Sequence, residues 1–131
     1  MNYVIMCVVF ARSIAMEKNA LITIKNNDSK TSYKVKVLLN DNTYRYREDT
    51  VNNTLVEFDS SNNILKREDD NLSMEYLFIN DKETIGKIYI KDLNKYIDVV
   101  IKTSKIEKNE NKILIEYTIS DDLYKYSIEM E

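Results

Sequence analysis

Few side chains in this sequence could carry out catalysis or bind a metal. The 131 residues include no histidine and a single cysteine, Cys7. A serine or cysteine nucleophile normally needs a histidine base, and metal sites need histidine, cysteine or clustered carboxylates. The acidic stretches 68–70 and 121–122 lack the spacing of a calcium loop, so we interpret them as solvated turns. We therefore expect no catalytic residue, metal or cofactor, and the one enzymatic alternative is a carboxylate pair across a cleft.

The ten tyrosines are the more informative set. Buried tyrosine hydroxyls seek hydrogen-bond partners, and a ring of them could hold a small apolar or amphipathic ligand. Arg67 could bind an anionic group with two N–H groups of its guanidinium, or it could have a structural role, pairing with Glu75 or Asp98 or lying along the end of the barrel. The alternative is that the tyrosines simply fill a core. The candidate ligand-binding residues are Arg67, Tyr44, Tyr46, Tyr76, Tyr117, Tyr124 and Tyr126.

The hydrophobic pattern of the chain is that of β-strands. In the last segment, Tyr124, Tyr126, Ile128 and Met130 alternate with polar residues. Successive side chains of a strand point to opposite faces, so this pattern predicts a half-buried strand. The same argument predicts no helix, and strands at 20–25, 32–39, 43–47, 54–59, 64–67, 72–79, 83–90, 95–105, 112–120 and 123–130.

Short strands at regular spacing, joined by short turns, indicate an antiparallel sandwich or an up-and-down barrel. Proline is absent and Gly86 is the only glycine, so the turns must be built from Asn and Asp. Gly86 falls inside a strand, which predicts a bulge or a sharp bend there. The strand 72–79 is apolar on both faces, so Leu77 and Ile79 are expected to contact the N-terminal segment or a partner.

Composition narrows the range of partners. The net charge is −3, and no run of Lys or Arg exceeds two residues, which argues against a nucleic-acid binder. One cysteine cannot form an internal disulfide, which favours a reducing, cytoplasmic location. The length is that of one domain.

The first fifteen residues have their own character. Residues 3–10 form an unbroken apolar run, too short to span a bilayer, which needs about 20 residues. The run could be a signal-peptide core, although it lacks a basic region before it. It could instead be an extra element packed on the domain, or an extension upstream of a true start at Met16. We therefore divide the chain into an extension, 1–15, and a domain, 16–131.

Several segments are similar to those of a known family: 19–25, 64–67, 72–78, 88–90, 97–103 and the tyrosine-rich hairpin at the end. On these residues the chain resembles the YwiB-like family of small bacterial calycin-like β-barrels, a domain of unknown function. One departure is that residues 68–70 are acidic where the family usually has a glycine. The resemblance implies a single antiparallel calycin-like (lipocalin-like) barrel of about 8–10 strands with meander topology. It implies no activity.

Together these observations predict a non-enzymatic binding module whose tyrosine-lined interior takes a small apolar or amphipathic ligand. The alternative is a structural or protein-interaction barrel with a filled core, acting as a homodimer or with a protein partner.

Overall fold

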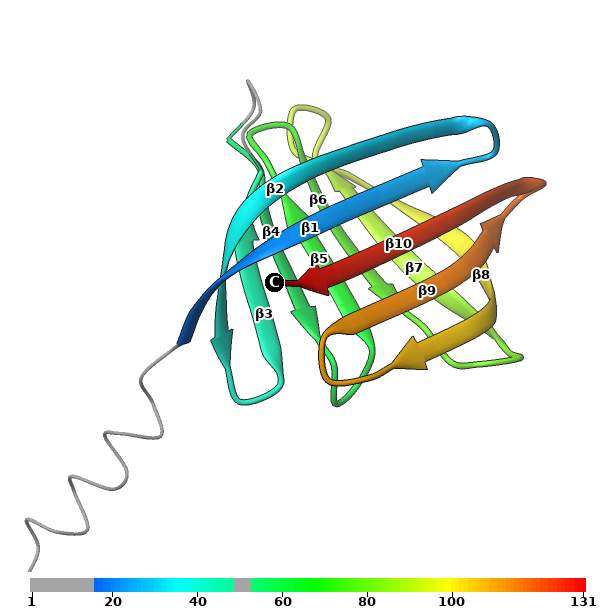
Figure 1. Ribbon diagram of the computed structural model, residues 1–131. Coiled ribbons are helices and arrows are strands. Elements are labelled where there is room, and N and C mark those ends of the chain that lie inside the picture. The colour runs from blue at the N-terminus through cyan, green and yellow to red at the C-terminus, as the bar shows by residue number, and fades with distance from the viewer. Residues whose placement is uncertain (1–15, 49–52) are drawn as a thin grey trace, which may run out of the picture.

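The chain folds into a closed antiparallel β-barrel of ten strands (Figure 1). The computed structural model describes residues 16–48 and 53–131. Each strand pairs with the next along the chain, and β1 closes the barrel by pairing with β10. This arrangement confirms the predicted all-β meander barrel. The strands are β1 Met16–Asn26, β2 Ser29–Asn40, β3 Thr43–Arg47, β4 Leu55–Asp59, β5 Ile64–Glu68, β6 Leu72–Leu77, β7 Glu83–Ile90, β8 Lys95–Lys108, β9 Lys112–Ile119 and β10 Asp122–Met130.

The barrel interior is built from the alternate residues of each strand, as the sequence pattern predicts. In β10, Tyr126 and Ile128 are buried while Glu129 between Ile128 and Met130 is exposed. The largest fully buried side chains are Phe58 and Phe78. Burying such a side chain contributes roughly 1.5–3 kcal/mol, so the core supplies most of the driving force for folding. Its other buried apolar members are Ala20, Ile22, Val37, Tyr46, Val56, Leu65, Tyr76, Ile101, Ile113, Ile115, Tyr117 and Met130.

Several strands are longer or shorter than predicted. β1 starts at Met16 rather than Ala20, because its polar residues continue the ladder with β2 through pairs such as Glu17–Leu38. β6 ends at Leu77. β8 reaches Lys108 through an irregularity between Thr103 and Lys105. The expectations for residues 1–15 lie outside the described residues. The described part of the chain holds no helix that could cross a membrane.

The turns are made by Asn and Asp, as the lack of glycine requires. Left-handed backbone conformations occur at seven non-glycine residues of the described chain, and six of them are Asn or Asp. These residue types tolerate positive φ best after glycine. The seven are Asn27, Asp41, Asn53, Asn63, Asp81, Asn94 and Ser120.

Ser120 is the exception in this set, which leads to a stability prediction. Its φ is 56° in the tight turn between β9 and β10. An L-residue pays roughly 1–2 kcal/mol for this conformation, and glycine pays less. We expect Ser120→Gly to raise the free energy of unfolding by about 0.5–1 kcal/mol in urea denaturation. Ser127→Gly, inside β10, is the control and should lower it; equal effects at both sites would contradict the explanation.

The outer surface carries alternating charges that we call the charge ladder. Its members are consecutive register partners across β3 to β8, and each faces neighbours of opposite sign. Two pairs are in ion-pair contact: Arg45 Nη2 lies 2.8 Å from Glu57 Oε1, and Lys66 Nζ lies 3.5 Å from Glu75 Oε1. Opposite charges in register stabilise neighbouring strands by roughly 0.2–1 kcal/mol per pair. The ladder consists of Arg45, Glu57, Lys66, Glu75, Lys87 and Asp98.

Candidate functional site

One end of the barrel interior is not filled by side chains. This is the end where β3, β5 and β9 finish and β4, β6 and β10 begin. A cavity of about 170 Å³ lies there, below the mouth of the barrel. It is lined by Ile24, Tyr46, Glu48, Val56, Leu65, Arg67, Met74, Tyr76, Tyr117, Ile119, Tyr124 and Tyr126.

The cavity brings together most of the candidate residues that the sequence singled out. Five of the six tyrosines and Arg67 line it. Tyr44 does not line the cavity. It also faces inward and packs against the core, but it lies two residues before Tyr46 and so deeper in the barrel, where it pairs with Phe58 of β4. The predicted ring of tyrosines therefore exists at the mouth without Tyr44.

Two hydrogen-bonded groups organise the polar side of the cavity. Tyr33 Oη donates to Glu48 Oε1 at 2.6 Å, and Arg67 Nη2 donates to Glu48 Oε2 at 2.7 Å. The hydroxyls of Tyr46 and Tyr126 bond to each other at 2.6 Å. Glu48 is only 4% exposed, so the guanidinium and the phenol offset the cost of burying its carboxylate.

Arg67 therefore has a different partner from the two that the sequence suggested. The prediction that it pairs with Glu75 or Asp98 is wrong, because Arg67 lies on the inward face of β5 while those carboxylates belong to the charge ladder outside. Glu75 pairs with Lys66 instead.

Glu48 and Tyr33 belong to the site but were not among the predicted residues. Tyr44, Tyr46 and Glu48 are spaced two residues apart. The inward-facing pattern of β3 therefore continues to Glu48, one residue past the end of the strand. Extending the strand pattern to Glu48 would have placed it inside. Tyr33 comes from β2. In the described residues β2 pairs with β3 only through residues 38–40, so the hydrogen bond from Tyr33 to Glu48 joins the two segments where they have no backbone pairing.

Burial changes the acidity of the tyrosines around the cavity. Desolvation raises the pKa of Tyr46, Tyr117 and Tyr126 above the ordinary value. The pKa of Tyr33 is also raised, first by desolvation and then by its bond to the Glu48 carboxylate. These phenols are therefore neutral over the physiological pH range and remain hydrogen-bond donors.

Aromatic packing fixes the walls of the cavity. The rings of Tyr117 and Tyr124 stack with centroids 5.2 Å apart and an interplanar angle of 11°. Tyr117 also contacts Tyr76 at 6.2 Å and Phe78 at 4.8 Å. Such aromatic pairs contribute about 0.5–1.5 kcal/mol beyond area burial, so these rings form a rigid group.

Gly86 provides the room for one of these rings. Of the two features expected at Gly86, a bulge or a sharp bend, the bulge is not found, since β7 and β8 pair regularly through Gly86 and the irregularity lies at Thr103–Lys105. A Cβ at Gly86 would lie 2.7 Å from both Tyr76 Cδ1 and Ile101 Cδ1. The glycine is needed because the Tyr76 ring packs against its backbone.

Substituting Gly86 should therefore disturb both stability and the cavity. We expect Gly86→Ala to lower the free energy of unfolding by about 1–3 kcal/mol through overpacking. The double variant Gly86→Ala/Tyr76→Leu should lose less than the sum of the two single changes, because the ring that clashes is gone. Strict additivity in denaturant titrations would show that Tyr76 is not the obstacle.

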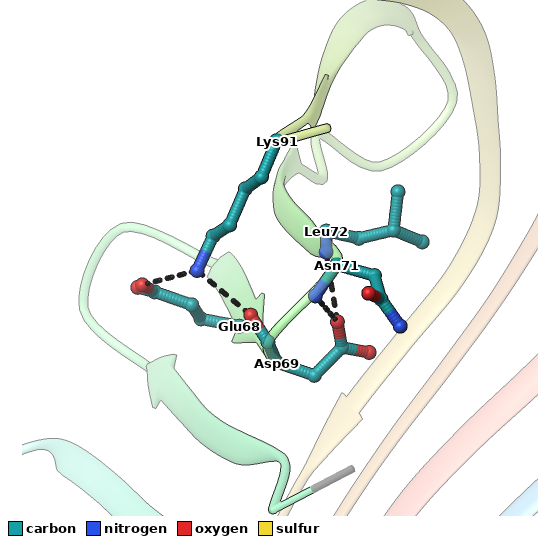
Figure 2. Close-up of polar contacts among 5 residues, drawn as sticks. All are labelled: Glu68, Asp69, Asn71, Leu72 and Lys91. Atoms are coloured by element: carbon teal, nitrogen blue, oxygen red, sulfur yellow. Dashed lines mark hydrogen bonds and ion pairs between the residues drawn. The ribbon is translucent and has the colours of Figure 1, made fainter. Parts of the chain in front are cut away.

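The acidic stretches form ordered turns. Figure 2 shows Asp69 accepting the backbone N–H groups of Asn71 and Leu72 at 2.7 Å each. Lys91, from the turn after β7, donates to Glu68 Oε1 at 3.1 Å and to the Asp69 carbonyl at 2.7 Å. Desolvation opposes ionisation of Asp69, but the two N–H bonds and the nearby Arg67 and Lys91 outweigh it, so its pKa is lowered.

In the second stretch, Asp122 Oδ1 accepts a bond from Asn27 Nδ2 at 2.9 Å. These carboxylates serve as turn acceptors, and the described residues contain no cluster of potential metal ligands.

A larger hollow of about 440 Å³ lies on the outside of the barrel, over β4 to β8. Four of its lining residues belong to the charge ladder, and the rings of Tyr89 and Tyr96, tilted against each other with centroids 4.7 Å apart, also line it. It is an open groove on the outer face, and it shares only Arg67 and Met74 with the lining of the tyrosine-rich interior cavity.

Comparison with known proteins identifies the fold as that of a class of small closed β-barrels. No protein-family model matches the sequence, and no curated protein matches it. Among solved structures, the barrel is similar to the crystal structure of YwiB protein from Bacillus subtilis, with a TM-score of 0.65. The similarity covers 93% of this chain and 97% of that chain at 18% sequence identity. The chain therefore has a YwiB-like fold.

Proposed function

We propose that this protein is a non-enzymatic binding module of the YwiB-like family, and that its cavity binds a small, largely apolar ligand. The observation that supports this is the unfilled interior beside a rigid group of aromatic rings. Binding sites are typically concave and apolar with a few placed polar groups. Here Ile24, Met74 and Ile119 supply apolar surface, and Arg67 and the tyrosine hydroxyls supply polar groups.

The size of the cavity limits the ligand. Pockets for drug-sized molecules are usually about 300–1,000 Å³, whereas an apolar cavity of about 150 Å³ takes benzene. At about 170 Å³, this cavity fits a single ring or a short branched chain, or the end of a longer molecule that extends through the mouth.

The test is native mass spectrometry of the full chain, followed by titration with toluene as a one-ring apolar probe. We expect a retained small-molecule adduct or saturable toluene binding detected by NMR. Ile119→Phe fills the cavity and should abolish binding, whereas Leu123→Phe, at a side chain 42% exposed on the outer face, should not. A clean unliganded mass together with no toluene binding would mean that the cavity holds only water.

A second candidate function is self-association through the outer face of β7 and β8. Ile85 and Val100 are register partners and are 53% and 46% exposed, and Ile79 is 41% exposed. Neighbouring apolar residues on a surface commonly mark an interface. Sedimentation of the full chain should show a dimer that Ile85→Lys/Val100→Lys converts to monomer. A monomer at all concentrations would exclude this candidate.

A further inference from the structure

We propose that the ligand of this cavity is a small apolar monocarboxylate, with its carboxylate on Arg67 and its apolar part among Ile24, Met74 and Ile119. This inference depends on the proposed binding function and specifies its ligand. It follows from which hydrogen-bonding atoms around the cavity are still free.

The one carboxylate of the site already has two hydrogen-bond partners. Glu48 carries the only carboxylate among the residues lining the cavity. One of its oxygens accepts from Tyr33 and the other from Arg67. With 4% of Glu48 exposed, its remaining lone pairs are poorly accessible to a ligand donor.

Unused donors remain on the other groups. Arg67 has five N–H donors and no acceptor, and within the described residues only one of the five has a partner, Glu48. In the bonded pair of Tyr46 and Tyr126, one hydroxyl must donate to the other, so the second keeps a proton without an acceptor in the described structure. A ligand with hydrogen-bond acceptors could bind both the free N–H groups of Arg67 and the free tyrosine hydroxyl. A cationic ligand would instead be repelled by the positive charge of the guanidinium.

The geometry of Arg67 suits a carboxylate at the mouth. Its side chain is 40% exposed, so one part of the guanidinium is anchored by Glu48 while the rest remains accessible. Arginine binds carboxylates through paired N–H bonds, which gives both affinity and orientation. The aliphatic residues then face the remainder of the ligand, within a volume that fits one ring.

The experiment compares four probes of similar size on the full chain by NMR titration: benzoate, benzyl alcohol, benzylamine and toluene. We expect benzoate to bind at least tenfold more tightly than toluene, and benzylamine to bind most weakly. Benzoate affinity should also fall as salt is added. If toluene or benzylamine matches benzoate, the carboxylate inference fails while the binding function stands. If none of the four binds, the proposed function itself fails.

Two variants separate the role of Arg67 in binding from its role in folding. Arg67→Met should reduce benzoate affinity at least tenfold and leave toluene affinity unchanged. Because Arg67→Met also removes a partner of Glu48, Arg67→Lys is the second variant: it keeps the charge, loses the paired N–H geometry, and should give an intermediate loss for benzoate alone. Equal losses for benzoate and toluene in Arg67→Lys, with thermal stability retained, would overturn the proposal.

Discussion

Raising the pH above 10 is expected to unfold the barrel steeply, because its most buried tyrosines resist ionisation in the folded state. Tyr46, Tyr117 and Tyr126 have raised pKa values through desolvation. A group whose pKa is raised on folding gives its full stabilisation at pH values below the pKa that it has in the unfolded chain, which is about 10 for tyrosine. This stabilisation is lost as the pH rises through 10 towards the folded pKa.

The size of this loss follows from proton linkage. Each such tyrosine lowers the free energy of unfolding by about 1.4 kcal/mol per pH unit above 10, so the three together lower it by about 4 kcal/mol per unit. A typical domain has about 5–15 kcal/mol in total, so we expect unfolding between about pH 11 and 14. The circular dichroism should change together with the part of the tyrosinate absorbance that comes from these three buried tyrosines.

Tyr117→Phe provides the control for this prediction. Tyr117 makes ring contacts to Tyr76, Phe78 and Tyr124 that phenylalanine keeps, and its hydroxyl has no hydrogen bond among the described residues. Removing this one ionising group should reduce the pH slope by about 1.4 kcal/mol per pH unit. Ionisation of all ten tyrosines near pH 10 with the β-structure intact would contradict the assignment of these phenols to the interior.

The second large effect is expected from Phe78→Ala. Phe78 is 1% exposed, and its ring lies 4.8 Å from Tyr117 and 6.4 Å from Tyr76. Truncating a buried phenylalanine costs about 3–5 kcal/mol, because transfer free energy is lost and a cavity remains. Urea denaturation should show this loss as a lower midpoint at an unchanged slope.

Leu123→Ala is the comparison for Phe78→Ala, since Leu123 is 42% exposed on β10. Its loss should stay within about 0.5 kcal/mol, as for most surface substitutions. Comparable losses at the two positions would mean that Phe78 is not part of the core.

Much of the barrel could be predicted from the sequence, because the side-chain period of a half-buried strand is visible along the chain. The segments 43–47 and 83–90 match β3 and β7 at both ends. The inward sets, such as Tyr124, Tyr126 and Ile128, also lie on the predicted face. In the absence of proline and with one glycine, the expected Asn and Asp turns were also found.

Contacts between distant segments were harder to predict, because alternation says which face a residue lies on but not what it meets across the barrel. The partner of Arg67 is Glu48, which lies nineteen positions earlier in the chain, just past the end of β3. The role of Gly86 was missed for the same reason, since the Tyr76 ring that requires it belongs to a different strand.

The charge ladder has a consequence for how the strands find one another during folding. Alternation of apolar and polar residues excludes a slip of one residue, which would turn every side chain to the wrong face, but a slip of two residues keeps the faces correct. If β5 slipped by two in one direction, Glu68 would replace Lys66 between Glu57 and Glu75 and bring three carboxylates together. A slip the other way would place Ile64 there and remove the attraction. The ladder thus distinguishes the native alignment from the misalignments that the hydrophobic core would accept.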